Sequence, residues 1–221
     1  MQNLDYNISK KINGEISMSL KIYSLFKRIF DVVSSTLLLI TLSPLFLILI
    51  ILVKLDSKGP VFFGHKRIGY KGEIISVYKF RSMVQNAEEV LRNFTPEQKA
   101  EFEKNFKLDD DPRVTKIGAF LRKTSLDELP QLINIIKGDM SVVGPRPIVQ
   151  KEVVKYGKYA DKLFSVKPGL TGFWQANGRS DTTYDERVQM DMYYIDNRST
   201  LLDIKILFKT VIAVIRKEGA I

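Results

Sequence analysis

The sequence contains no cysteine and only one histidine, His65. The absence of cysteine excludes disulfide bonds, thiol nucleophiles and zinc sites built on thiolates. A single imidazole cannot form a histidine-based zinc site, so we assign His65, in a basic turn, a structural or phosphate-adjacent role. A Gly-rich loop ending in Gly-Lys-Ser/Thr and a Gly-x-Ser-x-Gly motif are also missing. Their absence argues against P-loop nucleotide hydrolases and serine hydrolases of the elbow type.

Acidic residues are too few to balance the basic ones. The chain has 25 Asp and Glu against 34 Lys and Arg, a net charge of +9 over 221 residues. Such a charge indicates an anionic partner, which can be nucleic acid, a membrane surface or a phosphorylated substrate. No nucleic-acid-binding motif is recognisable, and the basic residues alternate with apolar ones rather than forming a stripe. We therefore expect no nucleic-acid partner.

One long apolar run is present, from residue 32 to residue 53, without a formal charge. It is long enough for a membrane helix and too long for the core of a signal peptide, so we interpret it as a retained anchor. Ser43 and Pro44 lie in its middle, and basic residues flank both ends. A straight span would place one basic flank on the disfavoured side of the membrane. The pattern favours a re-entrant helix that breaks at Ser43-Pro44, with a simple spanning helix as the alternative.

The chain divides into three parts on this interpretation. Residues 1–26 are a polar segment, loose to about residue 18, followed by a short interfacial helix over 19–30. Residues 27–58 are the re-entrant membrane helix, and residues 59–221 are a cytoplasmic catalytic domain with membrane-surface helices. The fold class is α+β and mainly helical, with a small β element that carries the active site. Asp31 is expected to pair locally with Arg28 at the membrane interface.

Local signals predict most of the remaining elements. Two short strands are expected at 61–63 and 73–80 around a glycine-punctuated turn. Capping boxes open helices at Thr95 and at Thr183. Loops are expected at 138–147 and 167–172. Other helices are predicted at 86–94, 117–122, about 129–137, 149–164 and 200–217, the last of them basic and amphipathic.

The sharpest local signal is Asp127-Glu128, in the segment Thr124 to Pro130. Ser125 and Glu128 fit a capping box, in which case Glu128 only caps a helix. Alternatively the helix begins at Pro130 and the two carboxylates precede it. Either arrangement places them near the positive end of a helix dipole, which favours ionised carboxylates and bound phosphate. An ionised Asp127 can attack phosphorus, and an adjacent Glu128 can hold a hard divalent cation.

Basic residues at strand ends and loops are candidates for phosphate recognition. Arg146 stands between Pro145 and Pro147, which restrict the backbone and present the guanidinium rigidly. Asp191 lies within a predicted helix beside its apolar face, where a simple boundary charge is the plainer interpretation. The candidate substrate-binding residues are Lys79, Arg81, Arg122, Arg146 and Asp191.

The motifs, taken in order, resemble one family. They include KRIFD, SP, GPVFF, KFRSM, TSLDELPQL, KGDMSVVGPRP and KPGLTGFWQ, and the likeness covers about residues 27 to 219. The chain is identified as a member of the bacterial sugar transferases, the monotopic phosphoglycosyl transferases. It resembles the catalytic half of longer polyprenyl-phosphate hexose-1-phosphate transferases, without their additional N-terminal membrane helices, which suggests a minimal form.

The resemblance implies a complete enzymatic function. The family transfers a sugar-1-phosphate from a UDP-sugar to polyprenyl (undecaprenyl) phosphate and releases UMP, using Mg²⁺. It implies that Asp127 is the covalent nucleophile, that Glu128 with Asp127 is associated with the metal, and that Arg146 and Asp191 belong to the substrate site. The implied location is the cytoplasmic face of a bacterial cell membrane. The implied role is the first membrane step of extracellular polysaccharide or glycoconjugate assembly.

Two points stay open. The loop 177–185 resembles that of glucose and galactose transferases, but the sequence does not name the sugar. A homodimer is kept as a further partner because nothing in the sequence decides the oligomeric state. The alternative function is a non-catalytic membrane scaffold that binds anionic lipid through its basic surface.

Overall fold

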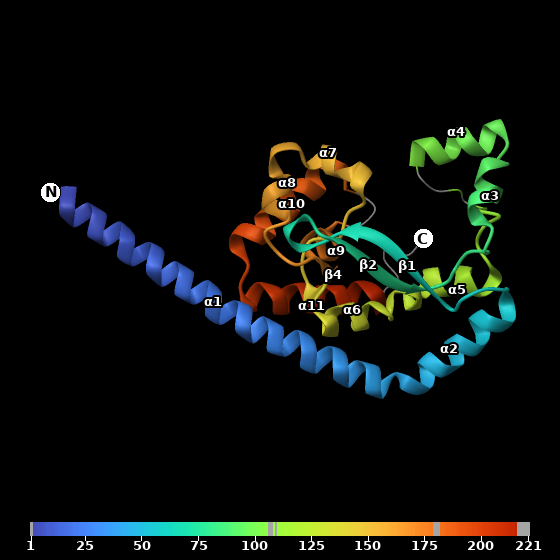
Figure 1. Ribbon diagram of the computed structural model, residues 1–221, viewed down its shortest axis with the longest axis horizontal. Coiled ribbons are helices and arrows are strands. Elements are labelled where there is room, and N and C mark those ends of the chain that lie inside the picture. The colour runs from blue at the N-terminus through green and yellow to red at the C-terminus, as the bar shows by residue number, and fades with distance from the viewer. Residues whose placement is uncertain (1, 106–107, 109, 179–181, 216–221) are drawn as a thin grey trace.

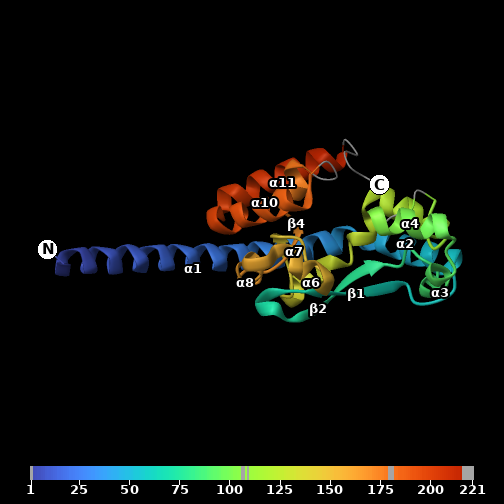
Figure 2. The ribbon, with the colours of Figure 1, turned by 90° about the horizontal axis from the view of Figure 1, so that it is seen from above.

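A computed structural model describes residues 2–105, 108, 110–178 and 182–215, with the side chains of 2–17, 103–105 and 214–215 left undescribed. Two long helices, α1 (Gln2–Thr41) and α2 (Ser43–Asp56), form a shallow V beneath the rest of the molecule (Figure 1). Seen from above, α10 and α11 lie on one side of these helices and the first two strands on the other (Figure 2). The bent pair is therefore the base on which the remaining elements are arranged.

The bend lies at the predicted break. The first proline of the chain is Pro44, and its missing N–H and fixed φ interrupt a helix that nothing upstream stops. The Ser43 hydroxyl donates to the Ile40 carbonyl at 2.8 Å. The predictions of a loose segment to residue 18 and of a separate helix over 19–30 are wrong, because one continuous α1 covers both.

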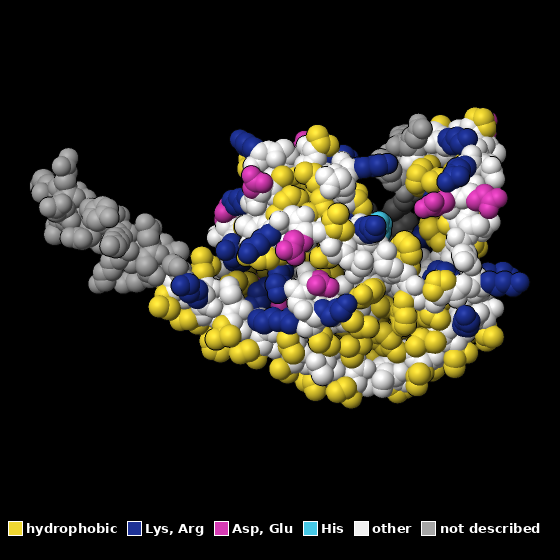
Figure 3. Space-filling view, viewed as in Figure 1, with side chains coloured by type: hydrophobic (Ala, Val, Ile, Leu, Met, Phe, Trp, Pro, Cys, Tyr) yellow, Lys and Arg dark blue, Asp and Glu magenta, His cyan; other side chains and the backbone are white. Residues whose placement is uncertain are grey.

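The two helices meet the length and composition expected of a membrane element only as a pair. Within the described residues no single helix has the length and hydropathy of a span, whereas Met18–Thr41 and Ser43–Asp56 pass that test together across a 65° bend. Large apolar side chains are exposed along both helices and along α11. Figure 3 shows them gathered on the α1–α2 edge, with the Lys and Arg side chains concentrated above it. Such a continuous apolar surface indicates a membrane or protein contact.

Helix α1 is attached to the body by buried polar contacts. Arg28 donates to the carbonyls of Ile135 and Ile136 at 2.6 and 2.7 Å. Asp31 is only 3% exposed and accepts hydrogen bonds from the Ser141 hydroxyl and the Val142 N–H. The predicted local pairing of Asp31 with Arg28 is wrong, because both side chains point away from their own helix and bond groups that are distant in sequence.

The first sheet is an antiparallel hairpin of β1 (Phe62–Ile68) and β2 (Ile74–Phe80). The two strands confirm the predicted β element, but β1 is longer than expected and takes up much of the predicted turn. His65 therefore lies on a strand, opposite Val77, and not in a turn. The actual turn is short, and Lys71 adopts a left-handed conformation in it with φ 57°.

The second sheet is a parallel pair of three-residue strands, β3 (Ser141–Val143) and β4 (Gly169–Thr171). It replaces parts of the loops predicted at 138–147 and 167–172. Glycine permits the close approach, since a Cβ on Gly169 would lie 2.1 Å from the Gly144 nitrogen. The strands are too short for a periodic sequence signal, and their partners are far apart in the chain, so local patterns did not reveal them.

Most predicted helices are present. They are α3 (Ala87–Arg92), α4 (Pro96–Asn105), α5 (Lys116–Thr124), α6 (Gln131–Lys137), α10 (Tyr184–Asn197) and α11 (Thr200–Ile215). The short helix α9 (Phe173–Asn177), which follows the loop predicted at 167–172, was not predicted. Both predicted capping boxes form, at Thr95 with Gln98 and at Thr183 with Glu186. The single helix predicted over 149–164 is wrong. Gly157 adopts φ 48° and separates α7 (Val153–Tyr156) from α8 (Ala160–Leu163). One short 3₁₀ turn, Gln150–Glu152, precedes α7, and another, Gly157–Tyr159, lies between α7 and α8.

Among the described residues, three apolar clusters fix the sheets against the helices, and the smallest joins Val77 of β2 to Leu132 and Ile135 of α6. The largest includes Tyr194, Ile195 and Ile206 of α10 and α11 together with Val143 of β3. A second joins Leu49 and Val53 of α2 to Phe80 of β2. The hairpin is thus anchored to the bent helix pair, while the parallel sheet is anchored to α10 and α11.

Candidate active site

Asp127 and Glu128 lie in a tight 3₁₀ turn, Leu126–Glu128, between α5 and α6. Ser125 ends α5 in the left-handed region with φ 56°, and its side chain makes no capping hydrogen bond. The capping-box interpretation of Ser125 and Glu128 is therefore wrong. The alternative is confirmed, because Pro130 is the N-cap of α6 and both carboxylates precede that helix. Residues with φ above zero other than glycine often mark constrained functional turns.

Lys79 of β2 connects the two carboxylates. Its Nζ lies 2.6 Å from Glu128 Oε1 and 3.6 Å from Asp127 Oδ2. Asp127 is buried, whereas the Glu128 side chain is 30% exposed. Burial raises the pKa of Asp127, with Lys79 opposing this shift and the Glu128 charge adding to it. For Glu128, burial also acts to raise the pKa, but the contact with Lys79 outweighs it and the net pKa is lowered. The two neighbours thus have pKa values shifted in opposite directions.

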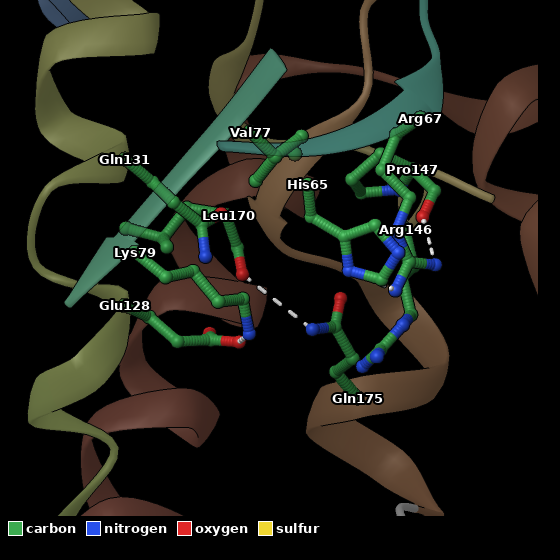
Figure 4. A pocket seen from close by; sticks show the side chains of 11 residues that line it. His65, Arg67, Val77, Lys79, Glu128, Gln131, Arg146, Pro147, Leu170 and Gln175 are labelled. Atoms are coloured by element: carbon green, nitrogen blue, oxygen red, sulfur yellow. Dashed lines mark hydrogen bonds and ion pairs between the residues drawn. The ribbon is translucent and has the colours of Figure 1, made fainter. Parts of the chain in front are cut away.

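A cavity opens in front of this turn, between the two sheets (Figure 4). Glu128 and Lys79 form one wall, and Arg146 and Gln175 approach from the other. The cavity lining is His65, Arg67, Val77, Lys79, Glu128, Gln131, Arg146, Pro147, Gly169, Leu170 and Gln175. Arg146 is solvent-exposed and flanked by buried prolines. Cations on both sides of a carboxylate pair suit a ligand with several negative charges.

The hairpin contributes two residues that sequence reasoning did not place correctly. His65 and Arg67 lie on the same face of β1, and Arg67 donates to His65 Nδ1 at 3.4 Å. Burial, together with Arg67 and Lys79, lowers the pKa of His65 to about 4, so its imidazole is neutral at physiological pH. Because Arg only donates, the bond leaves the His65 Nε2 as the proton-bearing nitrogen. The alternation of His65 and Arg67 along a strand was the available signal.

Two of the other predicted basic residues lie outside this cavity lining. Arg122 donates to the Ser82 hydroxyl at 2.9 Å, and its electrostatic partners include Asp127. Arg81 is buried and donates to the carbonyls of Val53, Ser57 and Pro60. Its guanidinium is thus committed to the end of α2 and the following turn, where it fastens the bent helix to the hairpin.

Asp191 is fully buried behind the cavity rather than exposed to it. Its Oδ2 accepts a hydrogen bond from the Tyr156 hydroxyl at 2.7 Å. Its Oδ1 has no hydrogen-bond partner among the described residues. Burial raises the pKa of Asp191 to about 7, and Tyr156 and the Arg146 charge only partly oppose it. Asp191 therefore lies within electrostatic reach of Arg146, and no sequence signal linked it to Tyr156.

The carboxylates of Asp127 and Glu128, called the dyad below, are ligands that suit a hard divalent cation. Mg²⁺ is commonly bound by one or two carboxylates together with substrate phosphates and water. Asp127 and Glu128 supply two carboxylates, and the Lys79 ammonium already occupies a cationic position close to both. Among the described residues no group of three or more acidic or imidazole side chains gathers at one point. A cation here would therefore need the phosphate oxygens of a bound substrate to complete its coordination.

Comparisons with known proteins agree with this arrangement. The model of the family described as bacterial sugar transferase matches residues 22–217. The chain is 51% identical over 197 residues to the undecaprenyl-phosphate galactose phosphotransferase of Salmonella typhimurium, covering 88% of this chain and 41% of the relative. It is 49% identical to the exopolysaccharide production protein ExoY of Sinorhizobium fredii, covering 88% of this chain and 87% of the relative.

A third relative is the UDP-glucose:undecaprenyl-phosphate glucose-1-phosphate transferase of Escherichia coli, 43% identical over 85% of this chain and 39% of the relative. The chain thus spans about two fifths of the length of the longer relatives and most of the shorter one. The family match begins within α1 and covers the rest of α1, all of α2, both sheets and the turn that carries Asp127 and Glu128. The chain belongs to the bacterial sugar transferase family.

Proposed function

We propose that this protein is a phosphoglycosyl transferase that moves a sugar-1-phosphate from a UDP-sugar to polyprenyl (undecaprenyl) phosphate. The observation that carries the proposal is the buried Asp127 beside Glu128 and Lys79, two residues that line a cavity with Arg146 on its opposite wall. The donor and the acceptor named for the relatives are both phosphorylated, which suits a cationic cavity. We further propose glucose or galactose as the sugar.

The reaction proceeds in two displacements on this proposal. An Asp127 carboxylate oxygen attacks the phosphorus that bears the sugar, the phosphoanhydride bond breaks, and UMP leaves with the bonding electrons. A phosphate oxygen of the polyprenyl acceptor then attacks the same phosphorus and releases the Asp127 carboxylate. Splitting one displacement into two through a covalent intermediate is the advantage of nucleophilic catalysis. Burial of Asp127 reduces its hydration and so favours attack once the carboxylate is ionised.

The charged side chains around Asp127 have different roles in the proposed reaction. Arg146 provides a planar guanidinium, which can bind two phosphate oxygens at once. Lys79 holds Glu128 ionised, as the lowered pKa of that carboxyl indicates. When Mg²⁺ is bound, by Glu128 with Asp127 and substrate phosphate, it supplies neutralisation of the charge that develops on the phosphates.

The acceptor explains the apolar base of the molecule. A polyprenyl phosphate keeps its chain in the bilayer and its phosphate at the surface. We propose that α1 and α2 form a re-entrant element in the cytoplasmic leaflet, with the 65° bend at Ser43-Pro44 turning the chain back. Changing Pro44 to Leu should favour a straight helix, and cysteine labelling in this cysteine-free chain would detect altered sidedness of positions 20 and 60.

The central test is intact-mass spectrometry combined with UMP release. Wild-type protein with a UDP-sugar panel and Mg²⁺, without acceptor, is expected to gain the mass of one sugar phosphate and to release UMP. Asp127→Asn should do neither. Asp196→Asn is the matched control, because that carboxylate is exposed and paired only with Lys162. Glu128→Gln is expected to weaken the Mg²⁺ dependence and turnover while leaving the fold intact.

Two results would redirect the proposal. Product formation only when both substrates are present, without any covalent adduct, would replace the two-step route by direct transfer. No UMP release with any UDP-sugar, together with tight binding to vesicles of anionic lipid, would favour the alternative of a non-catalytic membrane scaffold.

A further inference from the structure

Helix α1 contacts the back of the active site through one of its turns. Arg28 and Asp31 lie three residues apart on the same face and bond α6 and β3, respectively. Their neighbours Ile29, Phe30 and Val33 face outward and are about half exposed. One turn of this helix therefore carries an apolar outer face and a polar inner face that reaches into the catalytic body.

The two bonded elements lead directly to opposite walls of the cavity. Helix α6 has seven residues, and the dyad turn immediately precedes it. Arg28 holds the carbonyls of its last turn, roughly 10 Å from its start. Strand β3 ends at Val143, three residues before Arg146. Asp31 holds the beginning of this strand, so the bonds to Arg28 and Asp31 set how far the dyad lies from Arg146.

Asp31 completes an otherwise open strand edge. The Ser141 N–H donates to the Pro168 carbonyl on the β4 side. Because N–H groups alternate along a strand, the Val142 N–H points to the opposite side. There it finds Asp31 Oδ1 at 2.9 Å, with the Ser141 hydroxyl at 3.1 Å from the same oxygen. A carboxylate thus takes the place of a third strand and satisfies the partly buried Val142 N–H.

We propose that Asp31, supported by Arg28, is a positioning residue of the active site. It contacts no substrate and acts by holding β3, and through β3 Arg146, at a fixed distance from Asp127. Since Asp31 belongs to the proposed membrane helix, seating this helix in the bilayer and assembling the two cavity walls become one event. The inference rests on the proposed function for its kinetic part, whereas its geometric part can be measured independently.

The test compares Asp31→Ala, Asp31→Asn and Ser34→Ala. Ala removes the acceptor, Asn keeps an acceptor oxygen without the charge, and Ser34 is a control one turn further along α1 whose hydroxyl bonds only its own helix. Spin labels on introduced cysteines at Ile133 of α6 and Val154 of α7 report the separation of the two walls. Both positions are exposed, and the chain has no native cysteine.

Asp31→Ala in lipid nanodiscs is expected to broaden the distance distribution between these labels. It should also lower kcat for UMP release by about 10- to 100-fold, the scale expected when reacting groups are misplaced by about 1 Å. Asp31→Asn should give an intermediate distribution and an intermediate kcat, because it keeps an acceptor oxygen but loses the charge, and Ser34→Ala should change neither. If Asp31→Ala does not fold, Asp31→Asn carries the test through an intermediate distribution and an intermediate kcat.

A narrow, wild-type distribution in the folded Asp31 variants overturns the proposal, as does an unchanged kcat with a broadened distribution. Failure of the proposed function looks different. Wild-type protein would then release no UMP at all, while the distance measurement would still decide whether Asp31 holds the two walls.

Discussion

The two small sheets of this protein both contribute to the cavity, yet they are held together in different ways. The hairpin β1–β2 pairs seven residues with seven across a short turn. The parallel pair β3–β4 joins three-residue strands separated by a long excursion through α7 and α8. The hairpin supplies His65, Arg67 and Lys79, whereas the parallel pair places Arg146 and Gln175 through the segments that follow each strand.

The hairpin is stabilised mainly by contacts within adjacent sequence, whereas the parallel pair depends on contacts with distant parts of the chain. An antiparallel hairpin satisfies most of its ladder from adjacent sequence. Two three-residue parallel strands cannot do so, because parallel pairing needs long crossovers and three residues offer few hydrogen bonds. The parallel pair relies instead on glycine contacts, on the α10–α11 core and on Asp31. We expect that side of the cavity to be far more sensitive to remote substitutions than the hairpin side.

The largest effect is expected from a matched pair of glycine substitutions. A Cβ at Gly169 would lie 2.1 Å from the Gly144 nitrogen, whereas one at Gly64 would lie 3.5 Å from the Ser76 Cβ. Gly169→Ala should destabilise the protein by about 3 kcal/mol and lower kcat/KM by more than about 100-fold. Gly64→Ala should be neutral or slightly stabilising, since Ala is favoured over Gly in a strand interior. Thermal unfolding and UMP release measure both, and equal tolerance at the two sites would contradict the contrast.

Arg146→Lys tests the parallel side without disturbing its backbone. The charge is kept, but the planar two-point contact with phosphate is lost. We expect kcat/KM to fall by about 10- to 100-fold with unchanged thermal stability, in line with the strength of charge-assisted hydrogen bonds. Arg92→Lys, at the exposed end of α3, is the control. Normal turnover of Arg146→Lys would show that the fork geometry is unimportant.

Lys79→Met tests the hairpin side of the cavity through the pH dependence of the reaction rate. Lys79 is the largest of the groups that lower the pKa of Glu128, ahead of Arg146 and Gln131, so its removal should raise that pKa. The acidic limb of the pH–rate profile should therefore move to higher pH, with kcat lower by about tenfold at neutral pH. Lys137→Met serves as the control, because Lys137 is exposed and bonds the neighbouring Tyr78 hydroxyl. An acidic limb that stays in place would exclude this coupling.

The last effect concerns stability alone, without a change in turnover, and is expected at Asp191. Its pKa is raised from 3.8 to about 7, so between those values the folded state holds a proton that the unfolded state has released. The free energy of unfolding should therefore decline as the pH rises from about 4 to about 7, by at most about 1.4 kcal/mol per pH unit. Asp191→Asn should remove this part of the decline and gain relative stability above pH 7. Melting temperatures at pH 5 and pH 8 measure it, and parallel curves for both proteins would contradict the prediction.

The same contrast explains what could be predicted from the sequence. The hairpin strands, the bend at Pro44 and the capping boxes at Thr95 and Thr183 depend on residues within a few positions of one another. Such signals depend only on nearby residues, and the structure confirms the elements that they predict. The family assignment came from the motifs and is also confirmed.

Several differences between the sequence expectations and the structure concern contacts between distant residues. Arg81 was expected at phosphate and instead bonds carbonyls more than 20 positions earlier in the chain. Asp31 was expected to pair within its own helix, and it meets β3 across 110 positions. Buried charges choose partners according to tertiary geometry, which charge patterns along a chain do not encode. The roles of Asp127, Glu128 and Arg146 in the reaction stay predictions.

The position of Asp31 also has a consequence for the order of synthesis. Strand β3 is translated 110 residues after Asp31, an interval of roughly 5 to 20 seconds at ordinary rates of elongation. During that time the Asp31 carboxylate and the Arg28 guanidinium of α1 are not yet bonded to β3 and α6. When α6 and β3 emerge, their docking surface already exists, and the late, non-local sheet folds onto a template made early.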